Sequence, residues 1–240
     1  MSVLNIALIS SEEFARSLGK KGDVRDIESY VFKENRDGEI LSLSFLRPLK
    51  HPESIRPLLG VLDVAKAGVI ELSRIDSHFG EIVVAFGCSG IEIGFVIIDS
   101  QADEWIDPEK VRVILDQAGL ISWRIYDDSL KNHELREYLF SKISINDRQK
   151  ESPLIIPVDQ SFNVKGVGLV AIGYVQSGSI SKFDDIEIVP TKVSGVVKSL
   201  QVMDDSVETA FTGDRVGIAL RNVKTQIIQK GSIITNLDSY

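Results

Sequence analysis

Residues 212–223 read TGDRVGIALRNV, a turn followed by a strand-like run. Gly213 and Asp214 suit a hairpin turn of the primed type, and the apolar run 216–220 after them is typical of a strand. Short strand-like runs recur around this stretch at even spacing, and residues 186–189, 195–203 and 232–235 are further examples. The second part of the chain, after Pro153, therefore predicts a small closed β-barrel.

The first part of the chain has a different periodicity. Its short apolar runs predict strands at 5–9, 40–46, 67–72, 94–99 and 122–126. Helical spacing predicts helices at 12–18, 52–62, 79–88, 108–118 and 132–143. Strands that alternate with helices indicate an α/β fold, with a mostly parallel sheet and helices on both faces. The polar stretch 144–151 reads as a linker, so we expect domains at 1–149 and 150–240.

Composition limits the classes of function. The 240 residues include 27 basic and 35 acidic side chains, and the net charge is −8. This acidity argues against broad binding to nucleic acid, DNA included. No apolar run approaches the ~20 residues of a membrane span, and the N-terminus lacks the features of a signal peptide. The single Cys88 cannot form an internal disulfide, so we expect a cytoplasmic protein.

Five segments of the second part resemble, in order, the second domain of the translational GTPases, the family of elongation factor Tu. These segments are 157–168, 169–178, 185–190, 212–223 and 228–234. Residues 197–201, VKSLQ, resemble the selenocysteine-specific branch, SelB. Residues 18–22 (LGKKG) and 62–65 (LDVA) are similar to a degenerate SelB-like elongation factor of methanogenic archaea. The resemblance implies a degenerate P-loop-GTPase-like domain followed by an elongation-factor barrel.

The first part then occupies the position of the GTPase domain, but the motifs that bind nucleotide are missing. A phosphate loop needs G-x-x-x-x-G-K-[ST], whereas residues 10–18 read SSEEFARSL. Glu12 and Glu13 stand where phosphates would bind. LSFLRPL, residues 43–49, replaces the D-x-x-G motif that binds on the Mg²⁺ side. We therefore expect no GTP cofactor, no catalytic residues and no GTPase activity.

One residue of the guanine-reading motif is retained. N-K-x-D corresponds to SQAD at residues 100–103, so Asp103 is the one candidate cofactor-binding residue. A divergent GTP-binding switch that reads guanine through Asp103 is the first alternative function.

The barrel carries the candidates for RNA binding. In the family this domain helps to hold the acceptor end of aminoacyl-tRNA, and the cations Lys165, Lys198, Arg215 and Arg221 could contact RNA here. The family's adenine-contacting glutamate falls near Val197, which cannot make that contact. Scattered surface cations are the competing interpretation. The expected partners are tRNA or the ribosome.

Other chemistry has little support. His51, His78 and His133 lie far apart in sequence, so we expect no metal site. His78 lies in the stretch 76–81, which resembles a GTPase-domain loop, and we interpret it as a solvated loop residue. We interpret Cys88 as a small core residue.

The sequence ends at Tyr240, before the family's third domain. A second alternative follows from this: the protein is an interaction or dimerisation module, and a protein partner supplies the missing domain. The main hypothesis remains an elongation-factor-like binding module that does not hydrolyse GTP.

Overall fold

The computed structural model describes residues 2–24, 26–36, 38–100, 102, 104–127, 130–143, 152–202, 205–223 and 228–237. The chain divides into two compact units, Met1–Ile143 and Ser144–Tyr240. The predicted boundary at residues 149 and 150 lies in the stretch 144–151, which is outside the described residues.

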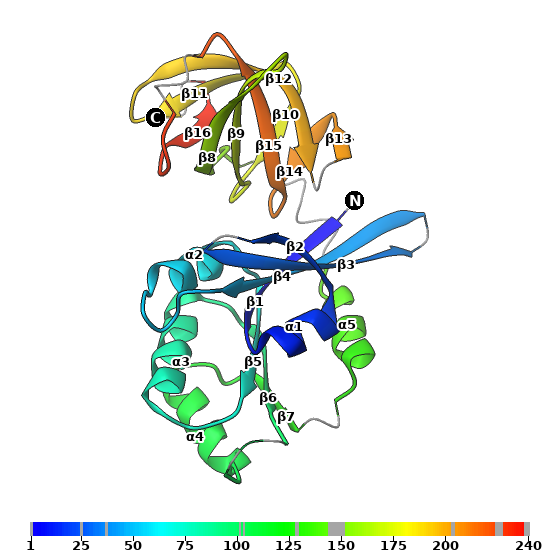
Figure 1. The fold of residues 1–240 in the computed structure, drawn as a ribbon, viewed down its shortest axis with the longest axis vertical. Coiled ribbons are helices and arrows are strands. Elements are labelled where there is room, and N and C mark those ends of the chain that lie inside the picture. Colours follow the sequence, from blue (N-terminus) through cyan, green and yellow to red (C-terminus); the bar gives the residue numbers. More distant parts are fainter. Residues whose placement is uncertain are drawn as a thin grey trace. The chain divides into compact units, whose positions relative to one another are not determined.

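The first unit is built on a seven-stranded sheet of order β2-β3-β4-β1-β5-β6-β7 (Figure 1). Its strands are β1 (Ser2–Ile9), β2 (Lys20–Val24), β3 (Ile27–Arg36), β4 (Glu39–Pro48), β5 (Ala67–Leu72), β6 (Ile93–Ile98) and β7 (Arg124–Asp127). β1 is parallel to β4 and β5, and β5, β6 and β7 continue in parallel. β3 is antiparallel to both of its neighbours, so the sheet is mixed.

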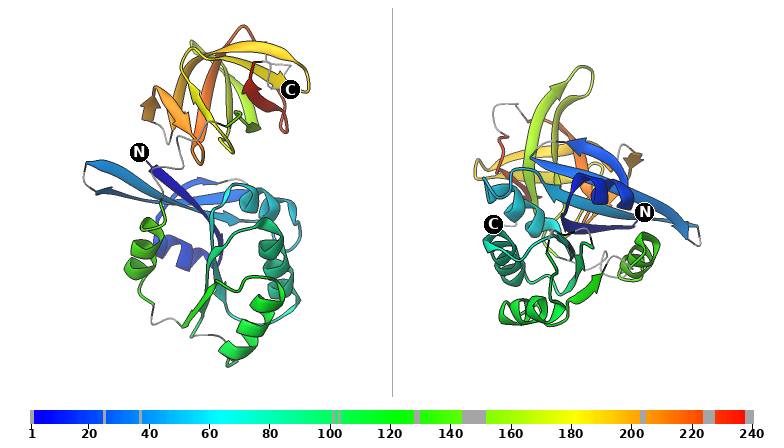
Figure 2. Two further views of the ribbon diagram at one scale, coloured as in Figure 1. Left: turned by 180° about the vertical axis from the view of Figure 1, so that it is seen from behind. Right: turned by 60° about the horizontal axis from the view of Figure 1, so that its bottom comes forward.

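Within the described residues, five helices cover the two faces of this sheet. They are α1 (Glu12–Leu18), α2 (Arg56–Val64), α3 (Ser77–Ser89), α4 (Pro108–Gln117) and α5 (Asn132–Phe140). α1 and α5 lie on one face and α2, α3 and α4 on the other, as Figures 1 and 2 show. Asp76 and Asp107 cap α3 and α4 with their carboxylates. Among the described helices, none combines the length and apolar character of a transmembrane span.

Two helix boundaries differ from the prediction by three residues or more. α2 begins at Arg56 rather than Pro52, because residues 51–53 form a turn that contains the cis peptide His51–Pro52. α5 ends at Phe140, three residues before the predicted end at Ile143. In both cases the helical spacing of apolar residues continues beyond the residues that are helical in the structure. Helix ends are therefore predicted less accurately than helix centres.

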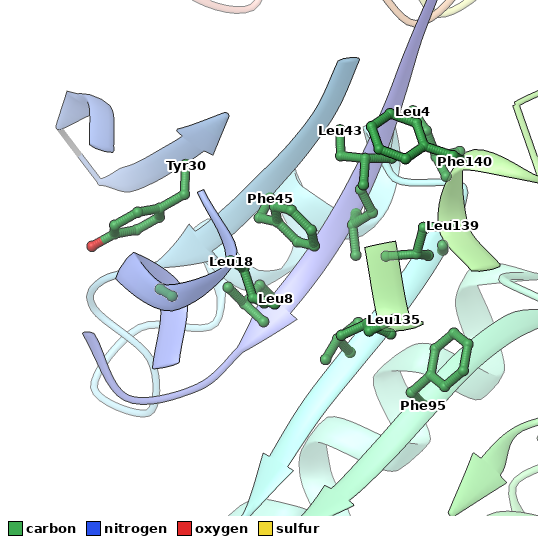
Figure 3. Packing of buried hydrophobic residues seen from close by; sticks show 14 of the residues in the cluster. Leu4, Leu8, Leu18, Tyr30, Leu43, Phe45, Phe95, Leu135, Leu139 and Phe140 are labelled. Atoms are coloured by element: carbon green, nitrogen blue, oxygen red, sulfur yellow. The ribbon is translucent and has the colours of Figure 1, made fainter. Parts of the chain in front are cut away.

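The core under α1 and α5 explains why the sheet carries apolar residues on its inner strands (Figure 3). Leu8 of β1 and Phe45 of β4 are fully buried, and Leu18 of α1 and Leu139 of α5 pack on them. The other face has its own anchor in Trp123. Its ring meets Phe86 of α3 edge-on at 4.7 Å between centroids.

The second unit is a closed antiparallel barrel of six strands, as the sequence predicts. Its strands are β8 (Ile156–Val164), β9 (Gly168–Tyr174), β11 (Asp185–Val189), β12 (Val193–Val202), β15 (Arg215–Arg221) and β16 (Ile233–Asn236). The order is β11-β16-β8-β9-β15-β12, and pairing of β11 with β12 closes the ring. β13 (Asp205–Val207) pairs antiparallel with the end of β12, and β10 (Ser179–Ser181) pairs antiparallel with β14 (Thr209–Phe211).

The turn at Gly213 and Asp214 is not a primed hairpin turn. β14 precedes this turn and β15 follows it, but the two strands pair with different neighbours. The N–H of Asp214 donates to the carbonyl of Phe211, and Gly213 has φ 93° at the third position. A single positive φ at that position is typical of a type II turn. The turn therefore connects β14, which pairs with β10, to β15, which pairs with β9 and β12, and it does not close a hairpin.

Candidate nucleotide and RNA sites

The connection between β1 and α1, where a phosphate loop would lie, consists of Ser10 and Ser11 alone. The hydroxyl of Ser11 accepts a hydrogen bond from the N–H of Phe14 at 3.1 Å and caps α1. The N–H of Ser11 donates to Oε2 of Glu71 at 2.7 Å. A phosphate cradle needs several N–H groups that converge on an anion. Here the N–H of Ser11 is bound to a carboxylate instead.

Glu12, the first residue of α1, adds a second carboxylate. Its Oε1 accepts from Nζ of Lys21 at 2.9 Å and from Nη2 of Arg16 at 2.6 Å. The hydrogen bond from Lys21, followed by that from Arg16, lowers the pKa of Glu12 from 4.5 to about 2. Glu12 is therefore ionised at neutral pH, and negative charge stands at the N-terminus of a seven-residue helix.

Glu28 on β3 forms ion pairs with the nearby cations Lys21 and Arg47. The residue is 3% exposed, and its carboxylate accepts from Lys21 at 2.6 Å, from Arg47 at 2.9 Å and from the Tyr30 hydroxyl at 2.9 Å. Burial alone would raise the pKa of Glu28, but the hydrogen bonds from Lys21, Tyr30 and Arg47 together hold it below 4.5. The hydrogen bonds that Lys21 donates to Glu28 and to Glu12 raise the pKa of Lys21. The cations beside the β1–α1 connection are thus neutralised within the protein.

The segment that replaces D-x-x-G lies within β4 and at its end. Pro48 still pairs with Ile27 of β3, and the N–H of Leu49 donates to the carbonyl of Asp26. Beyond it, the side chain of His51 is 6% exposed, and its Nε2 lies 3.4 Å from Oε1 of Glu81. This stretch therefore extends a strand and then packs against α3.

The guanine-reading position follows β6. Asp103, the predicted guanine-reading residue, lies outside the described residues. Of its neighbours, the N–H of Asp99 donates to the carbonyl of Leu72, and the N–H of Ala102 donates to the carbonyl of Asp99. These bonds hold the start of the segment against the end of β5.

Three of the four predicted RNA-binding cations lie at one end of the barrel. Lys165 is exposed in the turn between β8 and β9, and Nζ of Lys198 donates to the carbonyl of Val167 in that turn at 2.7 Å. Arg221 is the last residue of β15, opposite Val196 of β12. Arg215 is the first residue of β15, about 20 Å away along an extended strand. The structure thus brings together Lys165, Lys198 and Arg221.

The remaining predicted positions are ordinary. Val197 is fully buried inside the barrel. His78 stands in the first turn of α3, and His133 is exposed on α5. The expectation for Cys88 is wrong, because this residue is exposed near the end of α3. Within the described residues, no group of His, Cys, Asp and Glu could hold a metal ion.

Sequence reasoning missed the cluster around Glu28. The sequence-based prediction contains neither β2 nor β3, the strands that carry Lys21 and Glu28. The alternation of buried Glu28 and Tyr30 with half-buried neighbours was the available signal, but a glutamate on the inner face conceals the apolar period.

Both units have relatives among known proteins. Residues 168–235 match the family described as Elongation factor Tu domain 2. The chain is 28% identical to Uncharacterized protein MJ0325 of Methanocaldococcus jannaschii, over 98% of this chain and 73% of that protein. It is also 28% identical to the selenocysteine-specific elongation factor of the same organism, over 79% of this chain and 43% of that factor.

A solved structure covers both units. Translation elongation factor SelB from Methanococcus maripaludis, solved in complex with the GTP analogue GPPNHP, aligns with 100% of this chain at a TM-score of 0.78 and 22% identity. The two units therefore have the fold of the part of SelB with which they align. In sequence and in fold, the chain is similar to elongation factors of the SelB and EF-Tu type. It spans 56% of the solved SelB chain.

Proposed function

We propose that this protein is a SelB-like translation factor that neither binds nor hydrolyses GTP and acts as a binding module for tRNA or the ribosome. The observation that supports this most directly is the two-residue β1–α1 connection. The N–H of Ser11 is bound to Glu71, and the ionised Glu12 follows at once. A phosphate at this helix terminus would meet carboxylates where the P-loop supplies N–H groups and a lysine.

Nearby cations do not replace the missing lysine. Lys21 is shared between Glu12 and Glu28, and Arg47 is shared between Glu28 and the carbonyl of Ser10. A nucleotide would have to break these contacts before it gained any neutralising charge. Because Glu28 is buried, leaving it without a cation is costly.

Isothermal titration of the full chain with GTP and with GDP, each with and without Mg²⁺, tests the first half of the proposal. No heat of binding is expected at micromolar protein. Micromolar affinity that requires Mg²⁺ would contradict the proposal and favour the switch alternative. In that case Asp103→Asn should weaken binding, because the retained aspartate would be reading the guanine edge.

The RNA half of the proposal rests on Lys165, Lys198 and Arg221 at one end of the barrel. An electrophoretic shift with total tRNA, repeated at several salt concentrations, should show binding whose affinity falls as salt rises. Lys165→Ala and Arg221→Ala combined should weaken binding and reduce the salt slope by roughly 1 for each phosphate that the variant no longer neutralises. Arg215→Ala is the matched control, since it removes one cation from the opposite end of the same strand.

Two results would contradict the proposal that the barrel binds RNA at this site. Equal loss of affinity per cation removed in the control and in the double variant indicates a general effect of charge rather than a site. If tRNA fails to bind at low salt while light scattering shows an assembly, the protein-interaction alternative is correct.

A further inference from the structure

The segment between β6 and α4 presents an exposed tryptophan on a fixed support. Trp105 is 83% exposed, although the next residue, Ile106, is 7% exposed. Asp107 then caps α4 by accepting from the N–H of Glu109 at 3.0 Å. Ile106 is buried and Asp107 is hydrogen-bonded to α4, so the backbone directly after Trp105 is fixed in place.

Trp105 lines two pockets of the first unit, with volumes of about 760 Å³ and about 820 Å³. The first lies at the carboxyl ends of β5 and β6, beside the first turn of α3. Its apolar side comes from Ile70, Leu72, Phe79 and Ile82. The carboxyl edge of an open α/β sheet is where ligands most often bind.

The polar lining of the first pocket is predominantly acidic. Five carboxylates line it, from Glu71, Asp76, Asp99, Glu104 and Asp107. Arg74 and Lys110 are its two cations of fixed charge, and Arg74 lies 3.4 Å from Asp76. The carboxylates of Asp76 and Asp107 also accept hydrogen bonds from the backbone N–H groups of Phe79 and Glu109. The lining therefore attracts cations and repels anions.

We propose that the first pocket, beside Trp105, binds an alkylguanidinium group, which is the charged group of an arginine side chain. The face of an indole ring is the strongest natural partner for a planar cation, and guanidinium stacks on it readily. The carboxylate of Glu104, next to Trp105 in sequence, can accept from the guanidinium edge. The apolar side at Ile70 and Phe79 suits the methylene stem. This site is independent of the proposed translation-factor function.

Lys110 is the internal competitor for this site. Its ammonium is part of the lining, and a bound cation must approach it or displace it. Lys110→Met removes that repulsion and preserves most of the side chain's length. The variant should bind the ligand several-fold more tightly than the unaltered protein, an effect that general loss of structure would not produce.

Two-dimensional NMR titration of the full chain tests the proposal, because it detects weak binding and reports the fold of each variant. Agmatine with its amine blocked by an acetyl group serves as the free alkylguanidine, and the acetylated (4-aminobutyl)urea serves as its neutral counterpart. A blocked Gly-Arg-Gly peptide and its citrulline counterpart test an arginine presented by a polypeptide. We expect saturable shifts of the Trp105 indole N–H with the two guanidinium probes, and none with the neutral ones.

Trp105→Leu should weaken binding of the acetylated agmatine at least tenfold, and Glu104→Gln at least threefold. Glu53→Gln, an exposed charge removal on another loop, should leave it unchanged. Tighter binding of the peptide than of the acetylated agmatine would identify a polypeptide as the source, and the reverse would identify a small molecule. The proposal is wrong if neutral and cationic probes give the same shifts, if neither binds, or if Trp105→Leu binds as well as the parent.

Discussion

Arg47 links the buried carboxylate of Glu28 to the β1–α1 connection. Its Nη1 donates to Glu28 at 2.9 Å, and its Nε donates to the carbonyl of Ser10 at 2.7 Å. The side chains of Glu28 and Arg47 are 5% and 21% exposed. A pair this well shielded is held by hydrogen bonds more than by free charge attraction, and loss of one partner leaves the other uncompensated.

Glu28→Gln should destabilise the first unit by about 2–4 kcal/mol, because the neutral amide no longer balances Arg47 and Lys21. Urea denaturation followed by circular dichroism measures the change. The control is Asp26→Asn, which removes the carboxylate paired with Lys50 at 2.7 Å. Both of those side chains are more than half exposed, so the cost should be at most about 1 kcal/mol. Equal costs for both variants would show that burial does not govern the cluster.

Acid should remove the contribution of Glu28. Its folded pKa lies below the ordinary 4.5, so its contribution is complete above that value and is lost as pH falls through the folded pKa. The difference in stability between the parent and Glu28→Gln should therefore be constant from pH 7 to 5 and shrink as the pH falls below 4.5. Urea midpoints across this range measure it. A difference that persists at the acid end would assign the loss to packing instead of charge.

The fold was largely predictable because most of its signals are local. The bounds of α1 and β5 match the predicted 12–18 and 67–72, since each shows a regular apolar spacing with a clear end. β2 and β3 were missed because the inner face of β3 carries Glu28. The Gly213 turn was assigned to the wrong class because its type depends on which strands pair, which no local pattern reveals.

The contacts at the β1–α1 connection were beyond prediction for a similar reason. Glu71 and Arg47, which hold Ser11 and Ser10, lie 60 and 37 residues away along the chain. The sequence could show that glycines and a lysine are missing from residues 10–18. It could not show which side chains take their place, because parallel strand pairing brings those side chains together.

α5 is held on the sheet by two reciprocal contacts between arginine and phenylalanine. Arg136 of α5 lies 4.2 Å from the ring centre of Phe32, and Arg36 of β3 lies 4.4 Å from that of Phe140. Arg136→Ala should cost about 1–2 kcal/mol, because it removes both the cation–π interaction and the packing of the arginine stem. Amide exchange along α5 should accelerate with it. His133→Ala, an exposed change on the same helix, should stay within about 0.5 kcal/mol. If α5 exchanges at the parent rate in Arg136→Ala, this contact does not hold the helix.

The ring of Trp123 packs directly on the backbone of β6 at Gly94, where there is no side chain. A Cβ placed on Gly94 of β6 would lie 2.0 Å from Cε2 of Trp123, a contact that the ring could relieve only by leaving its site. The same ring meets Phe86 and donates from Nε1 to the carbonyl of Ile91 at 3.0 Å, so it cannot move alone. Gly94→Ala should therefore destabilise the first unit by about 1–3 kcal/mol through overpacking. The emission of the displaced Trp123 should shift towards the red.

Gly80→Ala provides the matched comparison for this prediction. Gly80 lies in α3, and a Cβ there would have nothing within 4 Å, so the substitution adds helix propensity without a clash. It should stabilise the protein by about 0.5–1 kcal/mol and leave the emission of Trp123 unchanged. Chemical denaturation followed by tryptophan fluorescence compares the two variants directly. Similar midpoints for Gly94→Ala and the parent would mean that β6 shifts enough to accept the methyl group. The close approach of strand and ring would then not be a requirement of the fold.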